Sequence, residues 1–245
     1  MRSIATLVVT LALASPAAGQ TTEQRSAEPA VTWSAEVDAS SRYLWHGLPY
    51  SDGLVIWPGV SLAARGFTFD LSVNLDPHYD PTFNEHDLSV GYEQAIGRLV
   101  LRGAFSRYTY RELAGDPGST SEVILGAAYS VGPGDVFTNH SFDVENYAGA
   151  YYADVGYGVE WELTPRSRLM ADASVAFWSK FARKYGLPSD GPLGPAILNV
   201  ELEQQLTRAL AVRPHVTFTR LLDRTARREL DAPGVTFGAA IVIAY

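Results

Sequence analysis

The chain has 245 residues, a formal net charge of −8 and no cysteine. The absence of cysteine excludes disulfides, thiol catalysis and thiolate metal sites. The acidic balance disfavours nucleic-acid binding, which needs a basic surface to displace counterions. This length fits one large β domain or two small ones.

The first 19 residues have the pattern of a secretory signal peptide. A basic start at Arg2 precedes an apolar run over 4–14, and small residues lead up to an expected cleavage after Gly19. The apolar run is too short to cross a bilayer as a helix. We therefore predict an exported protein with a signal peptide at 1–19, a flexible polar lead-in at 20–30 and a β-barrel at 31–245. An uncleaved anchor is the less favoured alternative.

Alternation with a period of two dominates the rest of the chain. Apolar and polar residues alternate without exception over 67–76, and the stretch 151–163 alternates in the same way. This period predicts strands with one apolar and one wet face, rather than amphipathic helices. No long apolar segment follows the signal, so a membrane protein with this pattern has to be a closed barrel that pairs every backbone group.

The same pattern predicts twelve strands, most of them of the length that a tilted membrane strand needs. Their expected spans are 31–45, 54–65, 67–76, 86–96, 98–110, 121–131, 135–144, 149–163, 167–179, 194–205, 208–220 and 234–245. Turns after even-numbered strands are short, as at Arg65-Gly66, whereas most connections after odd-numbered strands are long and polar, as over 180–192. Outer-membrane barrels are built in this way. We therefore predict an all-β, transmembrane, antiparallel up-and-down barrel of about twelve strands with both termini periplasmic.

The last strand and the aromatic residues indicate how the barrel meets the membrane. The strand ends on Tyr245, which shares a face with Phe237, Ile241 and Ile243. This looks like the terminal signal of outer-membrane barrels, so the barrel-assembly machinery is an expected partner through this strand; an ordinary edge strand is the alternative. Aromatic rings at both rims are expected to meet the headgroups of outer-membrane lipid. The expected interface aromatics are Trp33, Trp45, Trp161 and Tyr245.

If the apolar face of each strand contacts lipid, the other face lines the lumen. On that inner face, twelve acidic residues outnumber three arginines and a histidine. The acidic residues are Glu36, Asp38, Asp70, Asp87, Glu93, Glu122, Asp154, Glu160, Glu162, Asp172, Glu201 and Glu203. The basic residues are Arg42, Arg102, Arg213 and His215. Carboxylates around a water-filled path favour cations, so this set is expected to line a pore. A plugged lumen, in which acids and arginines satisfy one another, is the alternative.

Catalytic and metal-binding motifs are weak. His140 precedes Ser141, and His86 lies three residues before Ser89, but residues an odd number apart in a strand point to opposite faces. The acidic loop over 78–87 has histidines and carboxylates at a spacing that fits no compact metal-ligand pattern. We therefore predict neither an enzyme nor a metal or cofactor site, and an outer-membrane hydrolase is only the third functional hypothesis.

A family resemblance lies near the start of the predicted barrel. The stretch 37–47 (VDASSRYLWHG), followed by Ser51-Asp52-Gly53 and Trp57-Pro58-Gly59-Val60, resembles the TorF-like porins. Those proteins begin their barrel with a similar Ser-x-Tyr-x-x-x-Gly turn-in and a proline-bearing second strand, and 147–152 (YAGAYY) has the same character. The resemblance implies an outer-membrane porin and assigns a role to no individual residue.

Together these features predict a porin-like channel of the bacterial outer membrane, for passive or gated diffusion of small polar or cationic solutes through an acidic lumen. The alternative is a non-transporting barrel whose extracellular loops bind a partner or ligand. Outer-membrane lipid and small solutes or ions are the expected partners, nucleic acid is not, and the pattern fits monomers and trimers equally.

Overall fold

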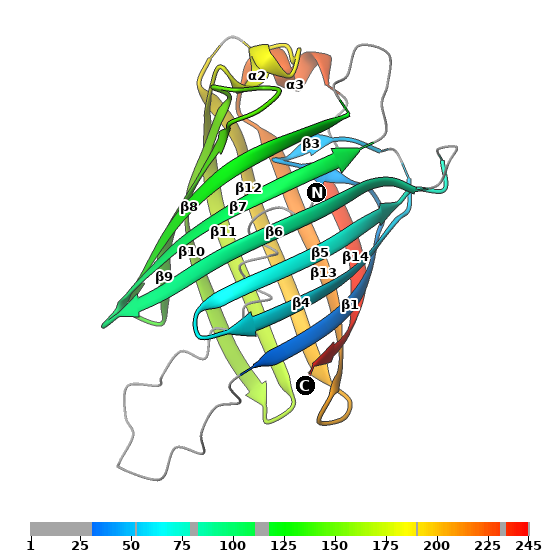
Figure 1. Cartoon of the computed structure of the whole chain (residues 1–245), viewed down its shortest axis with the longest axis vertical. Coiled ribbons are helices and arrows are strands. Elements are labelled where there is room, and N and C mark those ends of the chain that lie inside the picture. Colours follow the sequence, from blue (N-terminus) through cyan, green and yellow to red (C-terminus); the bar gives the residue numbers. More distant parts are fainter. Residues whose placement is uncertain are drawn as a thin grey trace.

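The computed structural model describes residues 31–51, 53–78, 83–110, 118–189, 191–230 and 234–244. Twelve strands pair in antiparallel fashion into one closed barrel (Figure 1). The ring closes between β1 and β14, where Ser34 lies opposite Ala244 and Ser40 lies opposite Gly238. The predicted all-β, up-and-down antiparallel barrel is therefore confirmed.

The elements follow the predicted order. The barrel strands are β1 (Thr32–Ser40), β4 (Val55–Ala64), β5 (Phe67–Leu75), β6 (Phe83–Ile96), β7 (Leu99–Tyr110), β8 (Ser119–Val131), β9 (Gly134–Asp143), β10 (Tyr151–Thr164), β11 (Ser167–Ser179), β12 (Leu193–Gln205), β13 (Leu210–Leu221) and β14 (Val235–Ala244). The remaining elements are the short strands β2 (Leu44–Trp45) and β3 (Leu48–Pro49) and the helices α2 (Phe181–Lys184) and α3 (Arg224–Glu229). Among the described residues no helix is long and apolar enough to cross a membrane.

Short and long connections lie on opposite rims, as predicted. One rim, called here the short-turn rim, also holds the start of β1 and the end of β14 (Figure 1). Its first turn, Arg65-Gly66, has φ angles of 53° and 86°. Two positive φ angles in a two-residue turn match the twist of the strands that it joins. The other rim, called here the long-loop rim, carries α2 and α3 (Figure 1). The tight turns lie at 65–66, 97–98, 132–133, 165–166 and 206–209.

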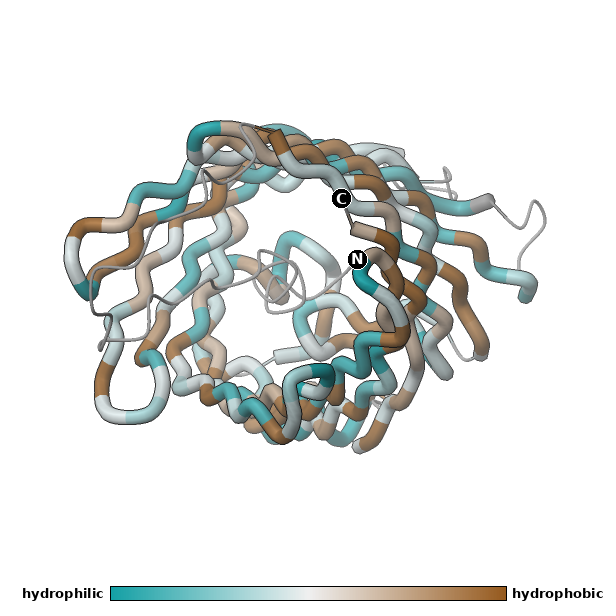
Figure 2. Tube along the Cα trace, turned by 90° about the horizontal axis from the view of Figure 1, so that it is seen from below, coloured by the Kyte–Doolittle hydropathy of each residue, from teal (hydrophilic) through white to brown (hydrophobic). Residues whose placement is uncertain are grey.

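The outer face of the barrel is apolar. Val60, Phe105, Leu125 and Ile241 each expose about half of their side-chain surface or more to the outside. Figure 2 shows hydrophobic residues alternating with hydrophilic ones along the strands that form the wall. A monomer in water rarely exposes so much contiguous apolar surface, whereas a transmembrane barrel needs such a band against lipid.

The first predicted strand, 31–45, is wrong in its last part, because β1 ends at Ser40. His46 and Gly47 have positive φ angles of 49° and 76°, and they turn the chain between β2 and β3. These two strands form a separate two-stranded sheet, called here the inner hairpin. A Cβ atom on Gly47 would lie only 2.7 Å from the Pro195 side chain and 3.2 Å from that of Thr219. The hairpin therefore packs tightly against the inner face of β12 and β13.

The inner hairpin belongs to a buried aromatic cluster near the long-loop rim, called here the mouth cluster. Its members come from the hairpin, from α2 and α3, and from strands on several sides of the barrel, so it ties these walls together. They are Tyr43, Trp45, Leu48, Val55, Trp57, Tyr108, Ala150, Tyr152, Ala176, Trp178, Phe181, Ala182, Leu221 and Ala226. The mouth cluster is the hydrophobic core of the described part of the chain.

Candidate functional site

The inner face of the barrel is the candidate site because it gathers the charged residues of the strands. On β1, Glu36 and Asp38 are buried, whereas Val37 between them is 48% exposed on the outer face. The same alternation places the expected pore-lining residues of the other strands on the inner face. These are Asp70, Arg102, Asp154, Glu160, Asp172, Glu201, Glu203, Arg213 and His215. Closure of the barrel brings residues far apart in sequence together there.

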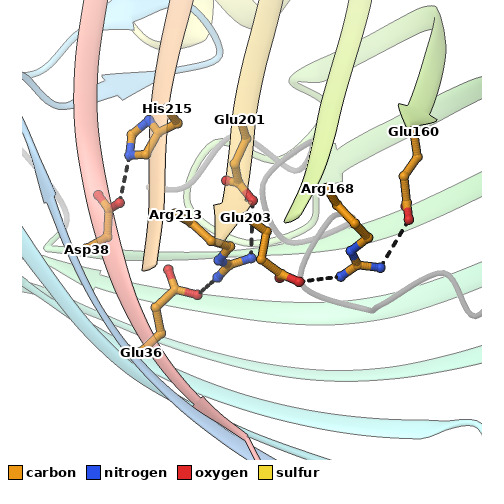
Figure 3. Close-up of polar contacts among 8 residues, drawn as sticks. All are labelled: Glu36, Asp38, Glu160, Arg168, Glu201, Glu203, Arg213 and His215. Carbon is orange, nitrogen blue, oxygen red and sulfur yellow. Dashed lines mark hydrogen bonds and ion pairs between the residues drawn. The ribbon is translucent and has the colours of Figure 1, made fainter. Parts of the chain in front are cut away.

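Arg213 forms a buried charged contact on this face, which Figure 3 draws. It bridges two carboxylates: its Nη2 pairs with Glu36 on β1, and its Nη1 lies 3.4 Å from Glu201 Oε1 on β12. β14 lies between β13 and β1, and it places the small residue Ala240 opposite Arg213. The long arginine side chain therefore has room to reach across the intervening strand.

His215 and Asp38 form a second contact across β14. His215 Nε2 lies 2.7 Å from Asp38 Oδ2, with Gly238 opposite His215 on the strand between them (Figure 3). A Cβ atom at Gly238 would lie 2.7 Å from His215 Nε2. A side chain on Gly238 would therefore push the imidazole away from the carboxylate.

A third charged group lies near the short-turn rim. Arg168 donates hydrogen bonds to Glu160 Oε1 at 3.1 Å and to Glu203 Oε1 at 2.8 Å (Figure 3). Arg168 is not among the residues expected in the lumen, although it has the same strand parity as Asp172 and is the second residue after the turn at 165–166. Parity alone could have placed it inside the barrel.

Other inner carboxylates have neutral partners. Asn139 Nδ2 donates a hydrogen bond of 2.8 Å to Asp154, and Asn199 Nδ2 donates one of 3.0 Å to Asp172. Ser61 likewise donates to Asp70. A neutral donor orients a carboxylate without cancelling its charge. The remaining predicted arginine on a strand, Arg102, lies 2.5 Å from Glu93 through Nε.

A small cavity of about 90 Å³ with a mixed polar and apolar lining lies beneath the inner hairpin. Arg42, which follows β1, lines this cavity. Asp38, His215 and Asn199 contribute polar groups to the same cavity. By the rule that roughly 10–15 Å³ of such space holds one water, the cavity has room for several water molecules.

The mouth cluster packs around the inner hairpin, above this cavity. The His46 ring stacks on Tyr152 with 3.8 Å between centroids, and the Trp45 ring lies 4.6 Å from that of Tyr185. Burial lowers the pKa of His46 to about 3, so its imidazole is neutral at pH 7. Burial also raises the pKa of Tyr43, whose hydroxyl therefore remains protonated and donates to Glu85 at 2.8 Å.

The expected interface aromatics do not all face the membrane. Trp33 and Trp161 are 44% and 46% exposed on the outer face near the short-turn rim. Trp45 corrects the expectation: it is only 2% exposed and lies in the mouth cluster, because the chain turns inward after β1. Tyr245 lies outside the described residues, as do the segments 1–19 and 20–30, for which a signal peptide and a lead-in remain predictions.

The weak histidine–serine motif at 140–141 is not brought together by the fold. His140 lies on the outer face, where its Nδ1 is 2.7 Å from the Tyr151 hydroxyl, whereas Ser141 is buried on the inner face. This separation follows from strand alternation. Within the described ranges, no three or more His, Asp or Glu side chains are grouped so that they could hold a metal ion.

No protein-family model matches this chain, and no curated protein matches it either. Its structure is similar to the KdgM porin, with a TM-score of 0.58 and 9% identity over 86% of this chain and 99% of that one. A second KdgM structure, in complex with disordered oligogalacturonate, gives a TM-score of 0.53 at 8% identity, over 87% of this chain and 98% of that one.

The NanC porin has a TM-score of 0.57 and 11% identity, over 85% of this chain and 98% of NanC. An outer-membrane channel from Pseudomonas putida F1 has a TM-score of 0.51 and 11% identity, over 92% of this chain and all of that one. At these identities the likeness concerns the fold, which is that of outer-membrane porins and channels. Membership of the TorF-like porins stays a prediction.

Proposed function

We propose that this chain is a gated, porin-like channel of the bacterial outer membrane, which passes small polar or cationic solutes through an acidic interior. The observation that carries the proposal is a closed barrel with an apolar outer face and many ionisable side chains on its inner face. The similarity in fold to the KdgM and NanC porins also supports a channel function. In this proposal the long-loop rim faces the exterior and the short-turn rim faces the periplasm.

The ion pairs leave the interior negative. Arg213 contacts two carboxylates, and Arg168 also contacts two, so each of these groups retains one negative charge. Asp154 and Asp172 add charge that their amide partners do not cancel. Carboxylates in a confined space raise the local concentration of cations. A polyanion such as the oligogalacturonate of the KdgM complex would be disfavoured here, so we do not assign it as a solute.

Gating is part of the proposal because the mouth cluster occupies the interior near the long-loop rim. Trp45 and His46 of the inner hairpin pack against Tyr152 of β10 and Phe181 of α2. Solutes can pass freely at this level only if the hairpin shifts. The hairpin joins the wall through loop segments rather than through the barrel ladder, so it can move without unpairing the barrel.

The same packing favours one alternative function. A mouth cluster that never opens would make the barrel a sealed scaffold, acting through the loops of the long-loop rim. The two functions differ in one measurable property, which is whether ions cross the barrel.

The test is single-channel current through protein purified from outer membranes and inserted into a planar bilayer under a salt gradient. We expect stepwise opening with a reversal potential that shows cation preference. Insertion is checked independently by heat-modifiable mobility on gels. A correctly folded barrel that passes no current at any voltage or pH would overturn the channel and favour the sealed scaffold.

A further inference from the structure

An apolar groove of about 550 Å³ lies on the outer face of β10 to β13. Its volume is within the range of roughly 300–1,000 Å³ that is typical of ligand sites. The groove exists because the small residues Ala173 and Ala196 lie among the larger Val155, Leu198 and Phe218, which line it. Those three larger side chains are all exposed on the lipid-facing surface.

One row of the groove ends in a positive charge. Strand register places Val155 opposite Val175, Val175 opposite Ala196, and Ala196 opposite Arg220. Arg220 lines the groove, is exposed, and lies one residue before β13 ends at the long-loop rim. The groove therefore runs from an apolar strip of wall to a guanidinium at the membrane boundary.

More positive charge lies next to Arg220. Arg227 of α3 donates a hydrogen bond of 2.9 Å to the backbone oxygen of Leu221, the neighbour of Arg220 in sequence. The loop that carries α2 is tied to α3 by a 2.9 Å bond from Gly191 N to Asp223 Oδ2. The exposed basic residues of these segments, called here the basic rim, are Lys180, Arg183, Lys184, Arg220, Arg224, Arg227 and Arg228. This concentration contrasts with a chain whose net charge is −8.

We propose that the groove and the basic rim together bind a phosphorylated lipid, with an acyl chain in the groove and the phosphate at Arg220. Lipid tails are as apolar as the groove, so contact with the groove distinguishes one acyl chain from another only by its shape. Selectivity between lipids therefore comes from the headgroup. An arginine suits a phosphorylated headgroup because its planar guanidinium donates two parallel hydrogen bonds to phosphate oxygens and stays positively charged.

A second copy of this chain fits the groove less well. A twofold dimer through this face would present the same surface from both copies and bring two basic rims close together. Like charges brought together across an interface disfavour the pairing. A phosphorylated lipid instead offers apolar surface where the groove is apolar and negative charge where the rim is positive.

The test is native mass spectrometry of the purified barrel in a non-ionic detergent, titrated with dioleoyl phosphatidic acid or with dioleoylglycerol, which has the same chains and no phosphate. We expect phosphatidic acid to bind about tenfold more tightly, in line with charge-assisted hydrogen bonding. Arg220→Gln should remove most of that preference, and Ala196→Phe should weaken both lipids by filling the groove. Arg208→Gln, an exposed arginine on the short-turn rim, is the matched control and should bind as the wild type.

Four results would overturn the proposal. Equal affinity for the two lipids would show that phosphate is not recognised, and unchanged phosphatidic acid binding in Arg220→Gln would remove the assigned residue. Displacement of the lipid by an equal concentration of inorganic phosphate would indicate an anion site without the groove. A dimer that Ala196→Phe dissociates would assign the groove to a second copy. None of these substitutions changes a side chain on the inner face of the barrel. Channel conductance therefore tests the proposed function separately from lipid binding.

Discussion

Arg213 shows how the interior tolerates buried charge. Its side chain is only 4% exposed and that of Glu36 is 6% exposed. Removing one partner of a buried ion pair typically costs about 3–5 kcal/mol, because the other charge is left without compensation. We therefore expect Arg213→Met to lower the free energy of unfolding of the barrel by an amount in this range, measured by urea titration of protein in lipid vesicles.

The controls separate electrostatics from packing. Arg208→Met removes an exposed guanidinium in a turn and should change the stability little. The double variant Arg213→Met/Glu36→Leu removes both charges of the more buried pair and leaves only Glu201, which is 13% exposed, without its partner. It should recover part of the loss, since apolar replacements of a buried pair are often neutral or better. A single variant as stable as the wild type would show that water reaches Glu36 freely.

His46 makes the mouth cluster sensitive to acid. Burial lowers the pKa of its imidazole from 6.5 to about 3 in the packed state. A displaced hairpin would return His46 to its ordinary value, so the displaced state binds the proton more readily between these two pH values. We therefore expect the packed state to keep this contribution to its stability above pH 6.5 and to lose about 1.4 kcal/mol per pH unit as the pH falls towards 3.

The expected result is a larger open fraction in single-channel records at pH 5 than at pH 7. His46→Asn should flatten this response, because asparagine does not titrate and accepts the positive φ of 49° found at this position. If the asparagine variant keeps the full pH response, then another group controls the opening and the assignment to His46 is wrong.

At the scale of elements, the inner hairpin depends on one glycine. Gly47 has a φ of 76°, and an added Cβ would lie 2.7 Å from the Pro195 side chain. Close-packed interiors do not absorb such an overlap without moving. We expect Gly47→Ala to displace the hairpin from β12 and β13 and to raise the open fraction of the channel several-fold, in single-channel recordings at constant pH.

Gly186 supplies the matched control for this change. It has a φ of 67°, so an alanine there carries similar backbone strain, but no atom lies within 4 Å of its added Cβ. Gly186→Ala should therefore leave the open fraction close to that of the wild type. Equal effects from the two variants would trace the response to backbone strain and not to the contact with Pro195.

The barrel strands were predictable because their alternation is local, whereas the inner hairpin was not. Tyr43 and Trp45 continue the alternation of β1, so the pattern alone extends the strand to 45. Trp45 packs inside the barrel against Phe181 and Tyr185, which lie far along the chain, so the local pattern could not show the inward turn. The two helices were not predicted because α2 has four residues and α3 has six, which are too few to show a helical period.

At the scale of the whole molecule, the inner face followed from parity, but its pairings did not. Strand parity placed Glu36, Glu201 and Arg213 on one face, whereas their contact depends on the register across β12, β13, β14 and β1. A shift of one residue in any of these strands would reverse its faces. Turn lengths and aromatic positions constrain the register only loosely, so the sequence predicted an acidic interior without predicting which acids are paired.

The overall charge of the interior leads to a prediction about ion selectivity. Asp154 and Asp172 lie on the inner face of neighbouring strands and bind only neutral side chains among their described hydrogen-bond partners. If ions pass through the lumen, the charges of these two carboxylates should act on them, because the hydrogen-bond partners given for them are neutral amides. We expect Asp154→Asn/Asp172→Asn to reduce the cation preference roughly twofold, since local carboxylates set the counter-ion concentration of a confined path. The measurement is the reversal potential under a salt gradient.

Charge and shape are separated by a second pair of substitutions. Asp154→Glu/Asp172→Glu keeps both charges while it changes their positions, so it should retain cation preference even if the conductance alters. Raising the salt from about 0.1 M to 1 M shortens the screening length from roughly 10 Å to 3 Å, so the wild-type preference should weaken there. A neutralised variant with an unchanged reversal potential would place the path of the ions away from these carboxylates. The selectivity would then have to come from the acids that Arg213 and Arg168 already hold.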